Sequence, residues 1–353
     1  MMPREEIAGW LKENDPIRLE SLRKRADETR RRNVGDEVHL RGLVEISNHC
    51  VRRCAYCGIG ARSKKDLPRY RMSAEEIIEC AKRAVELGFG TVVLQSGEDY
   101  GITRQWLADV VRRIKEQTGL AVTLSMGERP PEDLEEWRKA GADRYLLRFE
   151  TSDPELYAAI HPSPSGRPGH PDERLALLSR MREMGYEIGT GVMVGIPGQT
   201  YESLANDLMI IARMDADMIG LGPYVYDPDT PLGRGEVVHA AAPSEQAPAT
   251  ELMTCKTLAL ARILCPRANI PSTTALATIN PQAGRRNGLA WGANVFMPNL
   301  TPARYRALYA IYPRRLSIDA ADELARQEIV EFLAAIGRLP GRGHGGRRRE
   351  PPV

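Results

Sequence analysis

The chain has 353 residues, of which 42% are hydrophobic and 27% charged, and its formal net charge is +2. This length fits either two ordinary domains or one α/β barrel. The near-neutral charge excludes a strongly basic nucleic-acid binder as the main identity. The start MMPREEIAGW is charged, and no apolar run approaches the roughly 18 residues of a membrane span. The sequence therefore predicts a cytoplasmic protein with no membrane partner.

The expected elements alternate between strands and helices. An N-terminal helical extension is predicted over 1–36, a barrel over 37–315, a C-terminal helix over 316–338 and a disordered tail over 339–353. Within the extension, two polar helices are anchored by Leu11, Leu19 and Leu22. The expected strands span 41–47, 90–95, 121–125, 144–149, 187–194, 217–222, about 270–276 and 293–297. Eight such alternations predict an α/β fold with parallel strands, the (β/α)8 TIM-type barrel.

Several of these strands end in polar residues, although parallel strands buried on both faces are usually apolar throughout. The loops that follow barrel strands line the mouth of the barrel, so polar residues there are candidate site residues. They are Gln95, Ser96, Thr123, Ser125, Arg148, Glu150, Thr273 and Thr274.

Three of the six cysteines, Cys50, Cys54 and Cys57, form a CxxxCxxC motif directly after the first strand. Ordinary small side chains and structural zinc are two alternatives, but zinc needs a fourth ligand, and no downstream CxxC or HxxxH supplies one. Three thiolates suit a 4Fe–4S cluster that leaves one iron open. S-adenosylmethionine can chelate that iron, and one-electron transfer then releases a deoxyadenosyl radical. With Tyr56 before the third cysteine, the motif resembles that of the radical SAM superfamily.

Other residues suit the methionine end of S-adenosylmethionine. Gly97 and Glu98 follow the second strand, where superfamily members place a turn that holds the amino group, and a glycine there permits close approach of the backbone. Ser125 offers a hydroxyl and Glu150 an anion for the ammonium group. Arg174 offers a cation that pairs well with a carboxylate.

The resemblance narrows to one family. The stretches VLQSGED (93–99), TLSMGERP (123–130), GADRYLLRFET (141–151), MVGIPGQT (193–200) and GANVFMPNLTPARYRALYAIYP (292–313) look like HydE. That family is the radical SAM maturase that helps build the catalytic di-iron unit of [FeFe]-hydrogenase. The similarity covers about residues 40–315, and its GIPGQT segment looks like the turn that contacts adenine.

The resemblance implies an enzyme that cleaves S-adenosylmethionine reductively. Its substrate would be a small cysteine-ligated iron carbonyl–cyanide precursor in H-cluster maturation. The residues implied to contact S-adenosylmethionine are Tyr56, Gly97, Glu98, Ser125, Glu150 and Arg174. Those implied to face the substrate are Ser96, Thr123, Arg148, Thr273, Thr274, Met297 and Tyr305. The implied partners are other hydrogenase maturases and an electron donor such as ferredoxin or flavodoxin.

The chain departs from the family's pattern in two ways. Some members carry further cysteines near the C-terminus for an accessory cluster, but residues 315–332 contain none. Cys80, Cys255 and Cys265 are scattered on predicted helices as core residues, so one 4Fe–4S cluster is expected. Phe149 stands where a histidine is usual, which predicts a more apolar pocket.

Four other functions are open at this point. Methylornithine synthase, a radical SAM mutase that acts on an amino-acid skeleton, also resembles this family, although residues 271–313 look like HydE. Biotin synthase needs a second cluster, for which no clustered cysteines remain. A non-enzymatic iron–sulfur or zinc carrier would not require polar strand ends. The basic run 347–349 lacks the interleaved aromatic residues of a nucleic-acid binder and is expected to be a solvated end.

Overall fold

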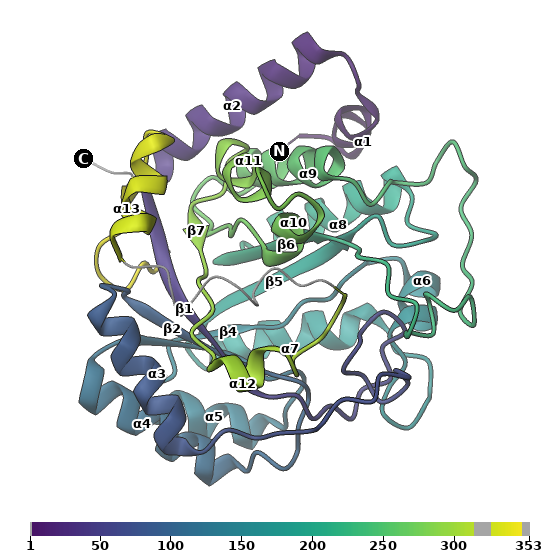
Figure 1. The fold of residues 1–353 in the computed structure, drawn as a ribbon. Helices are drawn as coiled ribbons and strands as arrows, with labels where there is room; N and C mark the ends of the chain where they lie inside the picture. The colour runs from purple at the N-terminus through teal and green to yellow at the C-terminus, as the bar shows by residue number, and fades with distance from the viewer. Residues whose placement is uncertain (1, 314–325, 348–353) are drawn as a thin grey trace.

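The computed structural model describes residues 2–313 and 326–347 and shows strands surrounded by helices (Figure 1). The strands are β1 (Glu37–Ser47), β2 (Thr91–Ser96), β3 (Ala121–Ser125), β4 (Arg144–Leu146), β5 (Glu187–Val194), β6 (Met218–Pro223), β7 (Val295–Phe296) and β8 (Leu339–Pro340). The helices are α1 (Arg4–Lys12), α2 (Pro16–Val34), α3 (Ala74–Glu86), α4 (Arg104–Thr118), α5 (Pro131–Lys139), α6 (Pro154–Ile160), α7 (Pro171–Glu183), α8 (Tyr201–Arg213), α9 (Glu251–Leu264), α10 (Thr274–Ile279), α11 (Gly284–Ala290), α12 (Ala303–Arg306) and α13 (Arg326–Ala335).

The sheet is parallel and curls into a barrel. Its strand order is β6-β5-β4-β3-β2-β1-β7, with β8 beside β1. Two single parallel bridges, Met218 to Asn269 and Pro271 to Val295, place residues 269–271 between β6 and β7 and complete the ring. The architecture is therefore the predicted α/β fold of the TIM-barrel type.

The strand predicted over 270–276 is wrong beyond Pro271. Thr273 accepts a hydrogen bond from the backbone N–H of Leu276 and so begins α10. A threonine N-cap followed by an alanine-rich segment favours a helix over a strand. The barrel closes here through isolated bridges because the chain leaves the extended conformation after residue 271.

The crossover helices follow the expected periodicity. The capping box of Ser73 and Glu76 begins α3, and the helix buries Ile77, Ile78 and Ala81 against the sheet. Burial of an apolar helix face of this kind supplies most of the stability of such a layer.

The N-terminal extension consists of the two expected helices, α1 and α2, which pack on α8 and α9. Leu11 and Leu22 are buried there, and Leu19 is largely so. Figure 1 shows α2 beside α13, and Arg338, just after α13, forms an ion pair with Asp27 of α2 at 2.6 Å. The two ends of the chain are therefore joined.

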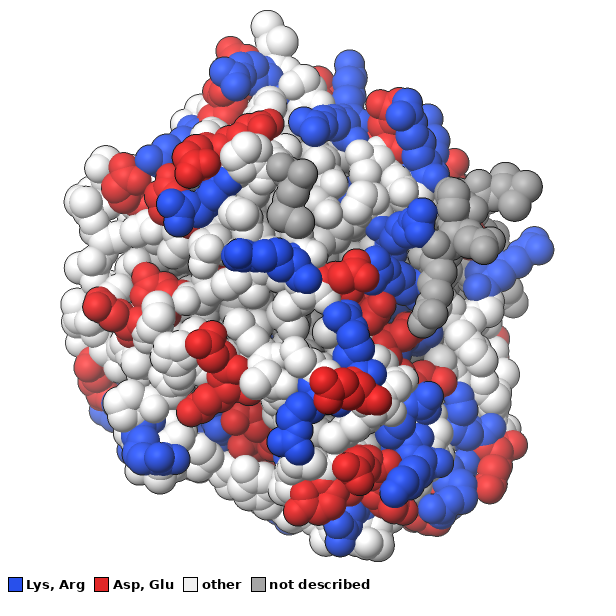
Figure 2. Space-filling model, turned by 180° about the vertical axis from the view of Figure 1, so that it is seen from behind, with Lys and Arg blue, Asp and Glu red and all other residues white. Residues whose placement is uncertain are grey.

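One face of the molecule shows Lys and Arg interspersed with Asp and Glu, in keeping with the small net charge (Figure 2). Within residues 2–313 and 326–347, no helix combines the length and apolar character that a bilayer crossing requires.

The predicted disorder of the tail is wrong for residues 339–347. Leu339 and Pro340 form β8 against β1. Arg347, predicted to lie in a solvated end, forms ion pairs with Asp215 at 2.5 Å and with Asp217 at 3.3 Å. The segment therefore crosses the end of the barrel at which the strands begin.

Two buried guanidinium groups explain this order. Arg41 donates to the carbonyl oxygen of Gly345 at 3.0 Å, and Arg144 donates to that of His344 at 2.9 Å. Burial lowers the pKa of Arg41 to about 9. Buried N–H donors without acceptors are costly, so the tail carbonyls stabilise both arginines. Composition alone shows no sign of this need.

Deletion of residues 339–353 should lower the free energy of unfolding by about 3–5 kcal/mol, because Arg41 and Arg144 then lose buried acceptors. Urea unfolding followed by circular dichroism measures this change. Arg347→Ala, which removes two ion pairs and one hydrogen bond to the carbonyl of Asp215 near the surface, should cost about 1 kcal/mol or less. Equal stability of the deleted and full-length chains would contradict a structural role for the tail.

Candidate functional site

The three cysteines lie on the loop that follows β1, at the end of the barrel where its strands terminate. Backbone hydrogen bonds attach this loop to three other segments: Val51 N–H to Glu98, Ala55 N–H to Ile160 and Gly58 N–H to Ile311, at 2.7–3.0 Å. Cys54 is buried, and Cys50 and Cys57 are half-buried. The loop that presents the cysteines is therefore fixed by the folded chain.

The chemistry of these thiols fits a metal cluster. Burial raises the pKa of all three, that of Cys57 to about 12, and neighbouring Cys50 raises the pKa of both Cys54 and Cys57 further. The three sulfurs are thus close enough to act on one another, and metal binding would deprotonate them. In the described part of the chain no three His, Cys, Asp or Glu side chains converge on a single ion. A 4Fe–4S cluster sets a different requirement, because each thiolate binds its own iron.

The turn after β2 touches the cysteine loop. A Cβ atom on Gly97 would lie 2.3 Å from the carbonyl oxygen of His49 and 2.6 Å from Cβ of Cys50, so only glycine fits. The backbone N–H of Glu98 points to Sγ of Cys50 at 3.4 Å. Ser96 donates to the carbonyl of Gly97 at 2.5 Å. The predicted residues Ser96, Gly97 and Glu98 therefore adjoin the first cysteine.

A buried network, which sequence reasoning missed in part, links Cys54 to the strand ends. Nε2 of His161 lies 3.2 Å from Sγ of Cys54, and Nδ1 lies 3.1 Å from Nη2 of Arg52. Arg52 and Arg174 each form an ion pair with Glu128, at 2.9 and 2.7 Å. His161 and Glu128 were absent from the predicted site, and they bring the cysteine loop and Arg174 together.

The hydrogen bonds define the protonation state of His161. Burial, followed by Arg174 and Arg52, lowers the pKa of this histidine well below its usual value, so the ring is neutral near pH 7. A guanidinium group only donates, so Nδ1 accepts from Arg52 and Nε2 carries the hydrogen. Nε2–H therefore points at the sulfur of Cys54.

Four predicted residues meet beyond this network. Arg148 forms an ion pair with Glu150 at 3.0 Å, and the hydroxyl of Tyr56 lies 3.5 Å from the same carboxylate. Arg174 donates to the carbonyl oxygen of Arg148 at 2.5 Å. Glu150 has φ +65°, in the left-handed region that a glutamate rarely adopts. Such a conformation is typical of residues in functional sites.

The remaining predicted residues have different surroundings. Ser125 ends β3 in register with Gln95, and Thr123 is buried with no hydrogen-bond partner for its hydroxyl among the described residues. Thr273 is the N-cap of α10 and Thr274 its first residue. Met297 is half-buried just after β7.

Tyr305 has contacts of another kind. Its ring stacks on Tyr70, with centroids 4.6 Å apart, and its hydroxyl donates to Glu76 at 2.9 Å. These contacts tie Tyr305 to the beginning of α3.

The prediction that Phe149 makes the pocket more apolar is wrong. Phe149 is fully buried and belongs to the apolar cluster that includes Val192, Leu204 and Leu208. Its neighbours in sequence, Arg148 and Glu150, instead form an ion pair with each other at 3.0 Å. Phe149 therefore contributes to packing between the sheet and α8.

The other three cysteines are free thiols. Cys80 on α3 and Cys255 on α9 are buried, as predicted, whereas Cys265, which ends α9, is half-buried. They lie on elements other than the loop after β1.

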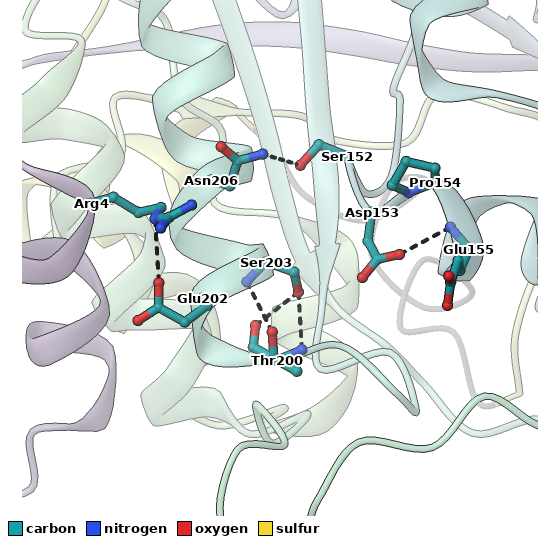
Figure 3. Close-up of a pocket in the computed structure, with 9 residues that line it drawn as sticks. All are labelled: Arg4, Ser152, Asp153, Pro154, Glu155, Thr200, Glu202, Ser203 and Asn206. Carbon is teal, nitrogen blue, oxygen red and sulfur yellow. Dashed lines mark hydrogen bonds and ion pairs between the residues drawn. The ribbon is translucent and has the colours of Figure 1, made fainter.

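A surface cavity of about 540 Å³ lies beside the segments after β4 and β5 (Figure 3). Its lining comes from residues 152–155, from 200–206 and from Arg4 of α1, which pairs with Glu202 at 3.4 Å. None of the three motif cysteines lines this cavity, so it is separate from the cysteine loop.

Comparison with known proteins identifies the class. Residues 44–209 match the model of the radical SAM superfamily. The fold aligns with the crystal structure of methylornithine synthase with a TM-score of 0.79 at 23% identity, covering 97% of this chain and 95% of that one. The structure of HydG, another maturase of the [FeFe]-hydrogenase, aligns over 96% of this chain and 73% of its own with a TM-score of 0.77 at 19% identity. The two structural matches show the fold; with the family model and the 45% identity to a curated relative, they make the chain a radical SAM enzyme, whose family implies a 4Fe–4S cluster and S-adenosylmethionine.

The sequence comparison is more specific. The chain is 45% identical to the [FeFe] hydrogenase maturase subunit HydE of Thermotoga maritima, over 98% of this chain and 94% of the relative. It is 30% identical to 3-methylornithine synthase of Methanosarcina acetivorans, over 78% and 73% of the two chains. The chain belongs to the HydE family.

Glu128→Gln should lower the free energy of unfolding by about 2–3 kcal/mol, because Arg52 and Arg174 then share a neutral partner in a buried site. Urea unfolding of the metal-free protein measures the loss. Glu79→Gln, which affects only an exposed pair with Lys82 on α3, should cost less than about 0.5 kcal/mol. Equal losses in the two variants would show that Glu128 has no special role.

Proposed function

We propose that the chain cleaves S-adenosylmethionine reductively and uses the resulting radical on a small cysteine-ligated iron carbonyl–cyanide precursor in H-cluster maturation. The sequence identity to HydE of Thermotoga maritima supports the assignment to hydrogenase maturation. The chemistry rests on one observation, the meeting of the cysteine loop with the strand ends through His161, Arg52, Glu128 and Arg174.

Cys50, Cys54 and Cys57 are proposed to hold one 4Fe–4S cluster. Their mutual electrostatic influence and the fixed loop fit such a group. When bound, the cluster supplies the electron that breaks a sulfur–carbon bond of S-adenosylmethionine. A single cluster is proposed because residues 315–332 contain no cysteine; of these, 315–325 lie outside the described residues.

The methionine end of S-adenosylmethionine is proposed to lie against Tyr56, Gly97, Glu98, Ser125, Glu150 and Arg174. Glu150 offers a carboxylate for the ammonium group, and Arg174 offers a guanidinium group that Glu128 holds in one orientation. The turn 195–200 is proposed to contact the adenine. Burial of these groups excludes water and strengthens their electrostatic interactions.

The substrate is proposed to lie further into the barrel mouth, against Ser96, Thr123, Arg148, Thr273, Thr274 and Met297. The guanidinium group of Arg148 suits a carboxylate or an anionic cyanide. The buried hydroxyl of Thr123 has no hydrogen-bond partner among the described residues and can donate to the substrate. Tyr305 is left out of this set because Tyr70 and Glu76 engage its ring and its hydroxyl.

Two kinds of protein partner follow. The reduction needs a one-electron donor, for which ferredoxin or flavodoxin is proposed, and the product needs the other hydrogenase maturases. A second candidate function is a mutase reaction, which rearranges the carbon skeleton of an amino acid; the 30% identity to 3-methylornithine synthase supports this alternative.

The physiological function is tested in a cell extract that contains the other hydrogenase maturation factors but lacks its own HydE-type protein. Addition of the reconstituted chain should restore hydrogenase activity, measured as hydrogen production. A chain that cleaves S-adenosylmethionine and yet leaves the extract inactive would overturn the proposed substrate and favour the mutase reaction.

Cys54→Ala should abolish both cluster binding and cleavage. The parent chain, reconstituted without oxygen, should hold about four irons and, given dithionite and S-adenosylmethionine, should yield deoxyadenosine and methionine. Iron analysis and chromatography measure the two quantities. Cys255→Ala, on α9, is the matched control and should retain both; cleavage by the Cys54 variant would refute the ligand assignment.

His161→Phe should lower the reduction potential of the cluster by roughly 20–60 mV, because it removes an N–H donor to a ligand sulfur. Phenylalanine keeps the stacking on Tyr157, where the ring centroids are 5.1 Å apart. A redox titration followed by electron paramagnetic resonance measures the potential. An unchanged potential at full iron content would show that this hydrogen bond does not tune the cluster.

A further inference from the structure

A fully buried carboxylate lies behind the strand ends. Asp207, on α8, accepts hydrogen bonds from the backbone N–H of Ser152 at 2.6 Å and from its hydroxyl at 2.5 Å. It also accepts one from Nε2 of Gln199 at 3.3 Å. One carboxylate therefore links two segments that are 47 positions apart in the sequence, 152 and 199.

Ser152 belongs to the segment that presents Glu150. The backbone N–H of Glu150 donates to Gly191 at 3.1 Å, and the carbonyl of Glu150 accepts from Met193 at 3.2 Å. The hydroxyl of Ser152 also accepts from Nδ2 of Asn206 at 2.9 Å (Figure 3). The attachment of Ser152 to Asp207 and Asn206 of α8 therefore influences where Glu150 lies.

Gln199 belongs to the turn 195–200. Its Oε1 accepts from the backbone N–H of Gly195 at 2.7 Å, and its Nε2 donates to the carbonyl of Met193 at 3.0 Å. Gln199 is fully buried, and Gly195 has φ +79°. A Cβ on Gly195 would lie 2.3 Å from the backbone of Ala249. The shape of this turn therefore depends on the amide of Gln199, which Asp207 holds.

We propose that Asp207 is a positioning residue that sets the spacing between the two halves of the S-adenosylmethionine site. This rests on the proposed function, in which Glu150 faces the methionine end and the turn 195–200 faces the adenine end. Because both segments bond to one carboxylate on one helix, neither half can shift without breaking a buried hydrogen bond.

The chemistry of the position requires an acceptor. Three N–H or O–H donors point at Asp207, so both carboxylate oxygens must accept. An asparagine would place an amide N–H against one of these donors. Burial raises the pKa of Asp207 to about 7, the hydrogen bonds from Ser152 and Gln199 oppose this rise, and Asp153 adds to it. Burial of such a group costs free energy that these hydrogen bonds offset.

The test separates spacing from general damage. In the cluster-loaded chain, Asp207→Asn should weaken the binding of intact S-adenosylmethionine about tenfold, since one buried hydrogen bond is lost. Binding of methionine alone and of 5′-deoxyadenosine alone should change less than about twofold, because each half-site keeps its own contacts. Anaerobic equilibrium dialysis measures all three dissociation constants.

Two further variants complete the design. Glu202→Gln, on the exposed side of α8, should leave all three dissociation constants unchanged. Glu202 forms a half-exposed ion pair with Arg4 and, within the described part of the chain, no hydrogen bond to Ser152, Gln199 or Asp207. Ser152→Ala removes the hydroxyl, and with it the bonds to Asp207 and Asn206, but keeps the backbone N–H bond to Asp207. It should weaken binding of the intact molecule about threefold, which keeps the proposal testable should Asp207→Asn fail to fold.

Wild-type affinity for S-adenosylmethionine in a folded Asp207→Asn chain would overturn the proposal. An equal loss for the intact molecule and for both fragments would also overturn it, because that pattern indicates general damage to the site. Failure of the parent chain to bind S-adenosylmethionine at all would instead refute the proposed function, so the two failures are distinguishable.

Discussion

The candidate site depends on one carboxylate between two buried cations. Arg52 comes from the cysteine loop and Arg174 from α7, and both pair with Glu128 from the segment after β3. Two buried guanidinium groups repel one another and each loses hydration, so they need nearby negative charge. Glu128 pairs with both of them, and buried Glu98 also lies 3.8 Å from Arg52. Arg52 in turn orients His161 toward Cys54. The place of the cysteine loop over the barrel is therefore determined by side chains as much as by its backbone hydrogen bonds.

The opposite end of the barrel follows the same physical rule. Arg41 and Arg144 are buried where the strands begin, and carbonyl groups of the tail accept their hydrogen bonds. A parallel barrel has two openings, and in this chain both contain buried arginines that need acceptors from distant segments. At one end the acceptor is a carboxylate beside the proposed cofactor site. At the other end the glycine-rich tail, which can approach closely, supplies backbone carbonyls, and Glu187 also pairs with Arg144 at 2.6 Å.

Local pattern sufficed to find the cysteine motif, the polar ends of β2 and β3 and the capping box that begins α3, because each depends on spacing of a few residues. His161 and Glu128 escaped because their partners are 107 and 76 positions away, Cys54 and Arg52. A lone histidine or glutamate in a loop has no local feature that marks such a contact. Phe149 and the tail were predicted wrongly for a related reason. The burial of each depends on residues distant in sequence, those of β5 and α8 for Phe149 and the two buried arginines for the tail.

The two carboxylates, Glu128 and Asp207, meet the same short stretch of chain from opposite sides. Strand β4 has only three residues, and the segment 148–152 beyond it joins β5 through a single parallel bridge between Glu150 and Val192. Arg174, oriented by Glu128, donates to the carbonyl of Arg148 at one end of this segment, and Asp207 holds Ser152 at the other. Between these two attachments Glu150 adopts its left-handed conformation. A strained residue persists only where its surroundings determine it, and here the backbone hydrogen bonds of Glu150 to β5 act together with the buried side chains on either side.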